Sequence, residues 1–188
     1  MIYPIYVYGT TVLRKRAKEI DKNYPDLNQL IPDMFETMKY SEGIGLAAPQ
    51  IGLSIRLIVI DSSGMDGEDE NDASLKDFKK VLINPVILEE SGDNWIFNEG
   101  CLSLPNLRED VERPSKIKIR YSDENFIQHE EEYDGIKARI IQHEFDHLEG
   151  ILLVDRIKPI RKRLLNGRLQ SIAKGITSVH YKIKTAGK

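Results

Sequence analysis

Two histidines and a glutamate in the segment Gln142–His147 (Gln-His-Glu-Phe-Asp-His) have the types and spacing of a metal-dependent hydrolase. His143 and His147 are four residues apart, so on an α-helix both imidazoles project from one face, about one turn apart. Two ring nitrogens at that spacing can bind one cation, and the carboxylate of Glu144 can reach a water on it. A surface helix with two solvated histidines is the simpler alternative, and residues upstream argue against it.

Cys101 is the only cysteine in the chain, which excludes an internal disulfide and suits a reducing cytoplasm. A free cysteine is commonly a small buried apolar residue. Beside two helical histidines, however, we expect it to be the third ligand, because three protein ligands with one open position describe a catalytic centre. His129 and His180 are weak candidates for a fourth ligand, and we expect His129 at the surface. A thiolate favours Fe²⁺, Zn²⁺, Ni²⁺ or Co²⁺.

The segment Glu42–Gln50 (Glu-Gly-Ile-Gly-Leu-Ala-Ala-Pro-Gln) contains another polar group of interest. Gly43 and Gly45 end a helix and permit a close approach of the backbone to another group, although a helix stop alone explains them too. Beside a metal, the side-chain amide of Gln50 can donate a hydrogen bond to a developing oxyanion.

Composition sets the broad class of the protein. The 188 residues are 40% hydrophobic and 30% charged with a net charge of -3, as in globular proteins, and are enough for one domain over 1–188. This charge excludes a strongly basic nucleic-acid binder. No apolar run approaches membrane-spanning length and no secretory signal precedes the first elements. We therefore expect a cytoplasmic protein without a membrane partner.

Periodicity predicts the elements that position these residues. Gly135 to about Leu148 should form the helix that carries the two histidines, ended by Gly150. The other predicted elements are a helix over 26–40, strands over 55–60, 80–88, 95–97, 117–121 and 126–133, a basic helix over 159–173 and a last strand over 176–183. Residues 1–23 are expected to be irregular, and the acidic stretch 62–77 to be a solvated loop. The prediction is an α+β fold with a central helix among antiparallel strands.

At this point the chain resembles a known family. Three segments, Gly43–Gln50, Glu99–Ser103 and Gln142–His147, look like the signature motifs of peptide deformylase in the family's order, and the similar layout extends to Asp155. The resemblance implies a single α+β domain and an enzyme that removes the N-formyl group from the initiator methionine of nascent polypeptides. It also implies one divalent ion, usually Fe²⁺, with Zn²⁺, Ni²⁺ or Co²⁺ as alternatives.

The resemblance also implies roles for individual residues. The implied metal ligands are Cys101, His143 and His147. Glu144 would be the general base and then the acid. Gln50 and the backbone N–H of Leu102 would hold the oxyanion, and Gly45 would contact the substrate backbone.

The pocket residues are less specific. For the methionine side chain we expect an apolar slot formed by Ile44, Leu102 and Ile140, with Phe97 and Ile136 nearby, and core packing is a near-equal explanation. Arg108 is expected to contact the peptide beyond methionine, unless it is only a surface charge. Glu42 and Asp146 are candidates for orienting the histidines.

The end of the chain is strongly basic. Residues 156–188 hold ten Lys or Arg and no Asp or Glu. One hypothesis is that this segment docks on ribosomal RNA, and a solvated charged face is an equal explanation. The residues concerned are Arg161, Lys162, Arg163, Arg168 and Lys174. A long acidic loop and a short basic helix followed by a strand depart from the family's commonest pattern.

Two other functions fit parts of the sequence. A zinc endopeptidase shares the histidine and glutamate spacing, but that interpretation leaves Cys101 without a role. A binding module that has lost catalysis is the second alternative, and the presence of Glu144 and Gln50 argues against it.

Overall fold

A five-stranded antiparallel sheet with the order β2-β3-β4-β5-β6 forms the framework of the protein. The computed structural model describes residues 1–63, 75 and 77–187, so most of the predicted loop 62–77 lies outside the described residues. The strands are β2 (Gly45–Ala47), β3 (Leu57–Asp61), β4 (Lys79–Gly100), β5 (Arg108–Ser122) and β6 (Gln128–Asp134). The strands predicted between residues 55 and 133 are therefore present, with shifted ends.

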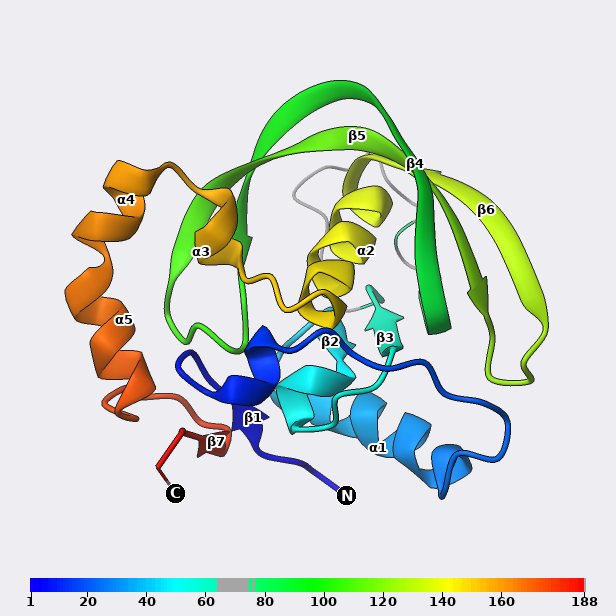
Figure 1. Cartoon of the computed structure of the whole chain (residues 1–188), viewed down its shortest axis with the longest axis horizontal. Coiled ribbons are helices and arrows are strands. Elements are labelled where there is room, and N and C mark those ends of the chain that lie inside the picture. The colour runs from blue at the N-terminus through cyan, green and yellow to red at the C-terminus, as the bar shows by residue number, and fades with distance from the viewer. Residues whose placement is uncertain (64–74, 76, 188) are drawn as a thin grey trace.

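The long strands β4 and β5 pair along most of their length and form an arch over the helix that carries the histidines (Figure 1). One strand runs through both predicted segments, 80–88 and 95–97, because a register shift between Ser91 and Asn94 accommodates Gly92, whose φ is +75°. A second shift, between Ile83 and Val86, falls at Asn84-Pro85, where proline has no N–H to donate to the neighbouring strand.

Helix α2 (Gly135–Leu148) has the predicted bounds and lies at the centre of the molecule (Figure 1). Its apolar face contacts β2, β3, β5 and β6, and Ala138 and Ile141 are fully buried. Helix α1 (Leu27–Tyr40) packs against β2 and β3 through Met34 and Met38. Helices packed on an antiparallel sheet confirm the predicted α+β class.

The chain ends differ from the prediction. Residues 1–23 contain strand β1 (Ile5–Tyr6) and the 3₁₀ helix η1 (Thr11–Arg14). The predicted last strand over 176–183 is wrong for most of its length, because only β7 (Ile183–Lys184) finds a partner, in parallel with β1.

The predicted single helix over 159–173 is also wrong. This segment is divided at Leu165 into α4 (Pro159–Leu164) and α5 (Asn166–Ala173). The division directly precedes Asn166 and Gly167, two poor helix formers. The short helices η2 (Ala48–Ile51) and α3 (Leu153–Arg156) complete the described elements. Among the residues that the structure describes, no helix is long and apolar enough to cross a membrane.

Gly150 at the end of α2 provides a test of this architecture. Its φ is +74°, and a Cβ there would lie 2.8 Å from the backbone of Arg14. We expect Gly150→Ala to lower the free energy of unfolding by at least about 1–2 kcal/mol, because an L-residue is strained in this conformation. Gly167→Ala is the matched control, because Gly167 lies near the start of α5 and no atom lies within 4 Å of the added Cβ. This substitution should raise the free energy of unfolding by roughly 0.5 kcal/mol. Urea unfolding measures both, and equal effects would contradict the prediction.

Candidate metal centre

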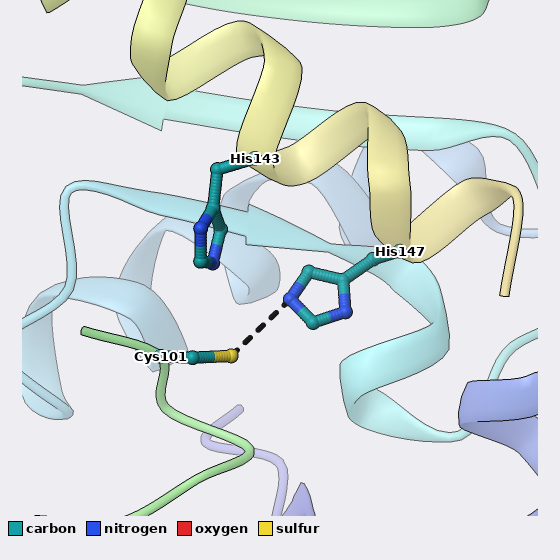
Figure 2. A group of neighbouring side chains, drawn as sticks. All are labelled: Cys101, His143 and His147. Carbon is teal, nitrogen blue, oxygen red and sulfur yellow. Dashed lines mark hydrogen bonds between the residues drawn. The ribbon is translucent and has the colours of Figure 1, made fainter. Parts of the chain in front are cut away.

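Three side chains from two segments converge on one point (Figure 2). Cys101 directly follows the end of β4, and His143 and His147 project toward it from α2. The Sγ atom of Cys101 lies 3.3 Å from Nε2 of His147, and one ligand atom from each residue lies within 4.8 Å of the others. A thiolate and two imidazoles at this spacing suit a late first-row divalent cation.

A buried carboxylate orients the first histidine. Oε2 of Glu99 lies 2.9 Å from Nδ1 of His143, which leaves Nε2 available as a ligand. The same carboxylate accepts hydrogen bonds from Arg113 at 2.7 and 3.0 Å and from Arg139 at 2.9 Å. Burial alone would raise the pKa of Glu99, but the hydrogen bonds from His143 and Arg113 hold that pKa well below its usual range.

The expectation that Asp146 orients a histidine is wrong. Asp146 accepts hydrogen bonds from Arg113 at 2.8 Å and from Arg156 at 3.0 Å. Its position on α2, one residue before His147, turns it about 100° away from that imidazole. Glu42 is exposed and lines the cavity described below. Glu99 was not among the predicted site residues, although its position two residues before the predicted ligand Cys101 pointed to a role in the site.

Glu144 is buried next to the ligand set. Burial raises the pKa of Glu144 to about 7, and its Oε2 atom has no hydrogen-bond partner among the described residues. A buried carboxylate oxygen without a protein partner fits a site that receives a cation and water. A Cβ at Gly45 would lie 2.5 Å from Oε1 of Glu144, so a glycine is needed there for β2 to pass this carboxylate.

Gln50 is held in one orientation by the backbone. Its Oε1 atom accepts a hydrogen bond from the N–H of Ala47 at 2.8 Å, so the amide nitrogen must point the other way. Nε2 lies 3.9 Å from Sγ of Cys101 and 3.4 Å from Oγ of Ser103. The donor end of the amide therefore faces Cys101 and Ser103.

A cavity of about 490 Å³ opens beside these residues. The expected pocket residues Ile44, Leu102, Ile140, Phe97 and Ile136 all line it, together with Gln50, Gly45, Glu144, Arg139 and Tyr181. Arg108 is also on the wall, where its Nε donates to the side chain of Asn98 at 2.9 Å. The structure thus brings the predicted site residues to one place.

The remaining histidines have partners elsewhere. His129 on β6 is half-buried and lies 2.8 Å from Oδ2 of Asp123. His180 is exposed, with its Nε2 atom 2.8 Å from the carbonyl of Tyr40. Neither is part of the group formed by Cys101 and the two α2 histidines.

The fold and the site together are typical of a metal-dependent hydrolase of the α+β class, with a His-Glu-x-x-His helix facing a cavity lined by apolar and polar side chains. Comparison with known proteins makes the assignment specific, because the profile of the polypeptide deformylase family matches residues 2–163. The chain belongs to the polypeptide deformylase family.

Individual relatives agree along nearly the whole chain. The chain is 50% identical over 188 residues to the peptide deformylase of Christiangramia forsetii, covering 98% of this chain and 96% of that one. Among solved structures, a peptide deformylase from Legionella pneumophila is 35% identical with a TM-score of 0.80, covering 94% of this chain and 98% of that one. The one from Thermotoga maritima is 42% identical with a TM-score of 0.74, covering 85% and 99%. The predicted resemblance is confirmed, the chain is an enzyme, and its family supports deformylation of N-terminal formylmethionine.

The contact between Glu99 and His143 yields a prediction. Glu99→Gln should weaken the affinity for a divalent ion by about 10–100-fold, because the amide is a poorer acceptor for the N–H of His143. Glu109→Gln is a matched control, since Glu109 is also buried, pairs with Glu99 across β4 and β5, and contacts Arg161 instead of a histidine. Competition with a chromophoric chelator measures the affinity, and circular dichroism checks the fold. Equal affinities in the two variants would rule out the orienting role.

Proposed function

We propose that the chain, acting as one catalytic domain over 1–188, holds one divalent cation on Cys101, His143 and His147 and hydrolyses the N-formyl group of formylmethionyl polypeptides. The observation that carries the proposal is the convergence of three ligand atoms within 4.8 Å of one another, beside a buried glutamate. When bound, the cation, expected to be Fe²⁺ with Zn²⁺, Ni²⁺ or Co²⁺ as alternatives, lowers the pKa of a water toward about 7 and polarises the formyl carbonyl.

Glu144 moves the proton. Its carboxylate takes the proton of the attacking water and then gives it to the leaving amine. Burial raises the pKa of Glu144 above its usual range, which makes its carboxylate a stronger base. The absence of a side chain at Gly45 leaves Oε1 of Glu144 room beside β2.

Gln50 and Leu102 hold the charge that develops on the formyl oxygen. Nε2 of Gln50 and the backbone N–H of Leu102 donate to this oxyanion, and losing one such donor typically costs roughly 2.7–4 kcal/mol in activation free energy. The hydrogen bond from Ala47 already fixes the amide of Gln50, so little reorganisation accompanies the reaction.

The cavity receives the substrate. Ile44, Leu102 and Ile140 contact the methionine side chain, and the backbone of Gly45 contacts the substrate backbone. Arg108 contacts the peptide beyond methionine. The partners are formylated nascent polypeptides, which places the reaction in the cytoplasm.

The experiment that tests this function compares wild type with Glu144→Gln on a formyl-Met peptide. Metal-replete wild type should release formate and leave internal peptide bonds intact. Glu144→Gln should keep its metal and lose about 10²–10⁴-fold in kcat, because the amide cannot accept the proton. Formate detection, chromatography of the peptide and elemental analysis measure the three quantities. Wild-type turnover by metal-replete Glu144→Gln would refute the role of Glu144, and internal cleavage would favour the endopeptidase.

A second proposal concerns the basic end of the chain. Arg161 and Lys162 form ion pairs with Glu109 and Asp155, both at 2.6 Å, and this makes them poor candidates for a docking surface. We propose that the exposed residues Arg163, Arg168 and Lys174 contact ribosomal RNA.

Replacing these three residues with Gln should reduce co-sedimentation with ribosomes at low salt, because fewer phosphate contacts remain. Replacing Lys15, Lys18 and Lys22 near the start of the chain controls for net charge. Unchanged co-sedimentation of the first variant would exclude the docking proposal.

A further inference from the structure

The turn that follows β4 is held through three successive backbone carbonyls. The carbonyl of Cys101 accepts a hydrogen bond from the N–H of Leu104 at 2.9 Å, and that of Ser103 accepts one from the N–H of Tyr8 at 2.9 Å. Between them, the carbonyl of Leu102 accepts a hydrogen bond from the hydroxyl of Tyr181 at 3.0 Å.

These bonds fix the two peptide planes on either side of the Leu102 Cα. Because a peptide unit is planar, the bond to the Cys101 carbonyl also sets the direction of the Leu102 N–H. The bond from Tyr181 sets the next plane, so that rotation about either backbone bond of Leu102 would break a hydrogen bond. The donor to the Leu102 carbonyl, the hydroxyl of Tyr181, lies 79 residues further along the chain.

Tyr8 and Tyr181 belong to the two end segments of the chain, which pair with each other. The N–H of Ile5 donates to the carbonyl of Lys182 at 2.8 Å, and the N–H of Val7 donates to that of Lys184 at 3.0 Å. Tyr8 follows β1 by two residues and Tyr181 precedes β7 by two residues, so the parallel pair of these strands (Figure 1) holds both donors near the turn.

Further contacts attach the segment 178–184 to neighbouring elements. The side-chain amide of Asn106 donates to the carbonyl of Ser178 at 3.0 Å. Nε2 of His180 lies 2.8 Å from the carbonyl of Tyr40, the last residue of α1. The segment is thus attached to the turn after β4, to α1 and to β1.

Tyr181 is itself part of the cavity wall. The residue is 9% exposed and its ring belongs to the apolar cluster that α1, β2 and β3 form. It lines the same cavity as Leu102 and Glu144. Burial raises the pKa of Tyr181 to about 12, so its hydroxyl stays protonated and remains a donor at neutral pH.

We infer that Tyr181 is a positioning residue for deformylation, whose hydroxyl holds Leu102 so that the backbone N–H of Leu102 points at the oxyanion. The inference rests on the proposed function, because it requires the Leu102 N–H to be an oxyanion donor. It also makes the segment 178–184, which lies beyond the residues 2–163 matched by the family profile, part of the active site.

The substitution Tyr181→Phe tests the inference, because it removes the hydroxyl and keeps the ring. We expect kcat on a formyl-Met peptide to fall about tenfold, less than the 10²–10³-fold that follows loss of an oxyanion donor itself. KM, metal content and Tm should stay near the wild-type values, since the donor acts mainly in the transition state. Tyr181→Ala, which also removes the wall, should raise KM in addition.

Tyr40→Phe is the matched control. The hydroxyl of Tyr40 also reaches the C-terminal segment, at the carbonyl of His180 3.5 Å away, but Tyr40 is exposed and does not line the cavity. Its kcat should stay within about twofold of wild type, because the contact is at the surface and away from Leu102.

The alternative outcomes distinguish failure of the inference from failure of the proposed function. Unchanged kcat in Tyr181→Phe, even with a lower Tm, overturns the inference because the hydroxyl is then only structural. A loss of kcat that follows a loss of metal also overturns it, since the effect would act through Cys101. Absence of formate from wild type refutes the proposed function and the inference with it, whereas an active wild type with an unaffected variant refutes the inference alone.

Discussion

The carboxylate of Glu99 is the buried contact on which the geometry of the site depends. It lies at the end of β4 and accepts hydrogen bonds from Arg113 on β5 and from Arg139 and His143 on α2. One group therefore ties two strands and the central helix to each other at the place where Cys101, His143 and His147 converge. A buried carboxylate is costly unless all its hydrogen-bonding capacity is used, so few relative positions of these elements are acceptable.

Arg113 extends this contact into a buried network. Its guanidinium bridges Glu99 and Asp146, and Arg156 covers Asp146 from the solvent side. Breaking such a network leaves an unpaired buried charge, which is more destabilising than the intact network is stabilising. The network contributes specificity, because it sets the rotation of α2 that directs His143 and His147 toward Cys101 and Asp146 toward Arg113 and Arg156.

The sulfur of Cys101, the proposed third ligand, is positioned by different means. Cys101 lies in a turn without regular pairing, and such a turn needs partners from other segments for its backbone groups. Those partners are the two end segments of the chain, through Tyr8 and Tyr181. The remaining wall comes from β2, where Gly45 permits Glu144 to approach and Ala47 fixes the amide of Gln50. The contact of Gly45 with Glu144 and those of the turn join residues far apart in the sequence, whereas Ala47 and Gln50 are only three residues apart.

The sequence alone determined what depends on neighbouring residues. The spacing of His143 and His147 on one helical face, the bounds of α2 and most strands of the sheet follow from local periodicity and from residue types. The tertiary structure alone decided which partners distant residues find. It gave His143 the carboxylate of Glu99 instead of Asp146, paired Arg161 with Glu109, and brought Tyr181 to Leu102. It also left most of the predicted last strand unpaired, because a β pattern becomes a strand only where another strand offers its hydrogen-bonding edge. Local pattern fixes which way a side chain leaves its own element, but the charge or backbone group that it meets depends on the packing of the whole chain.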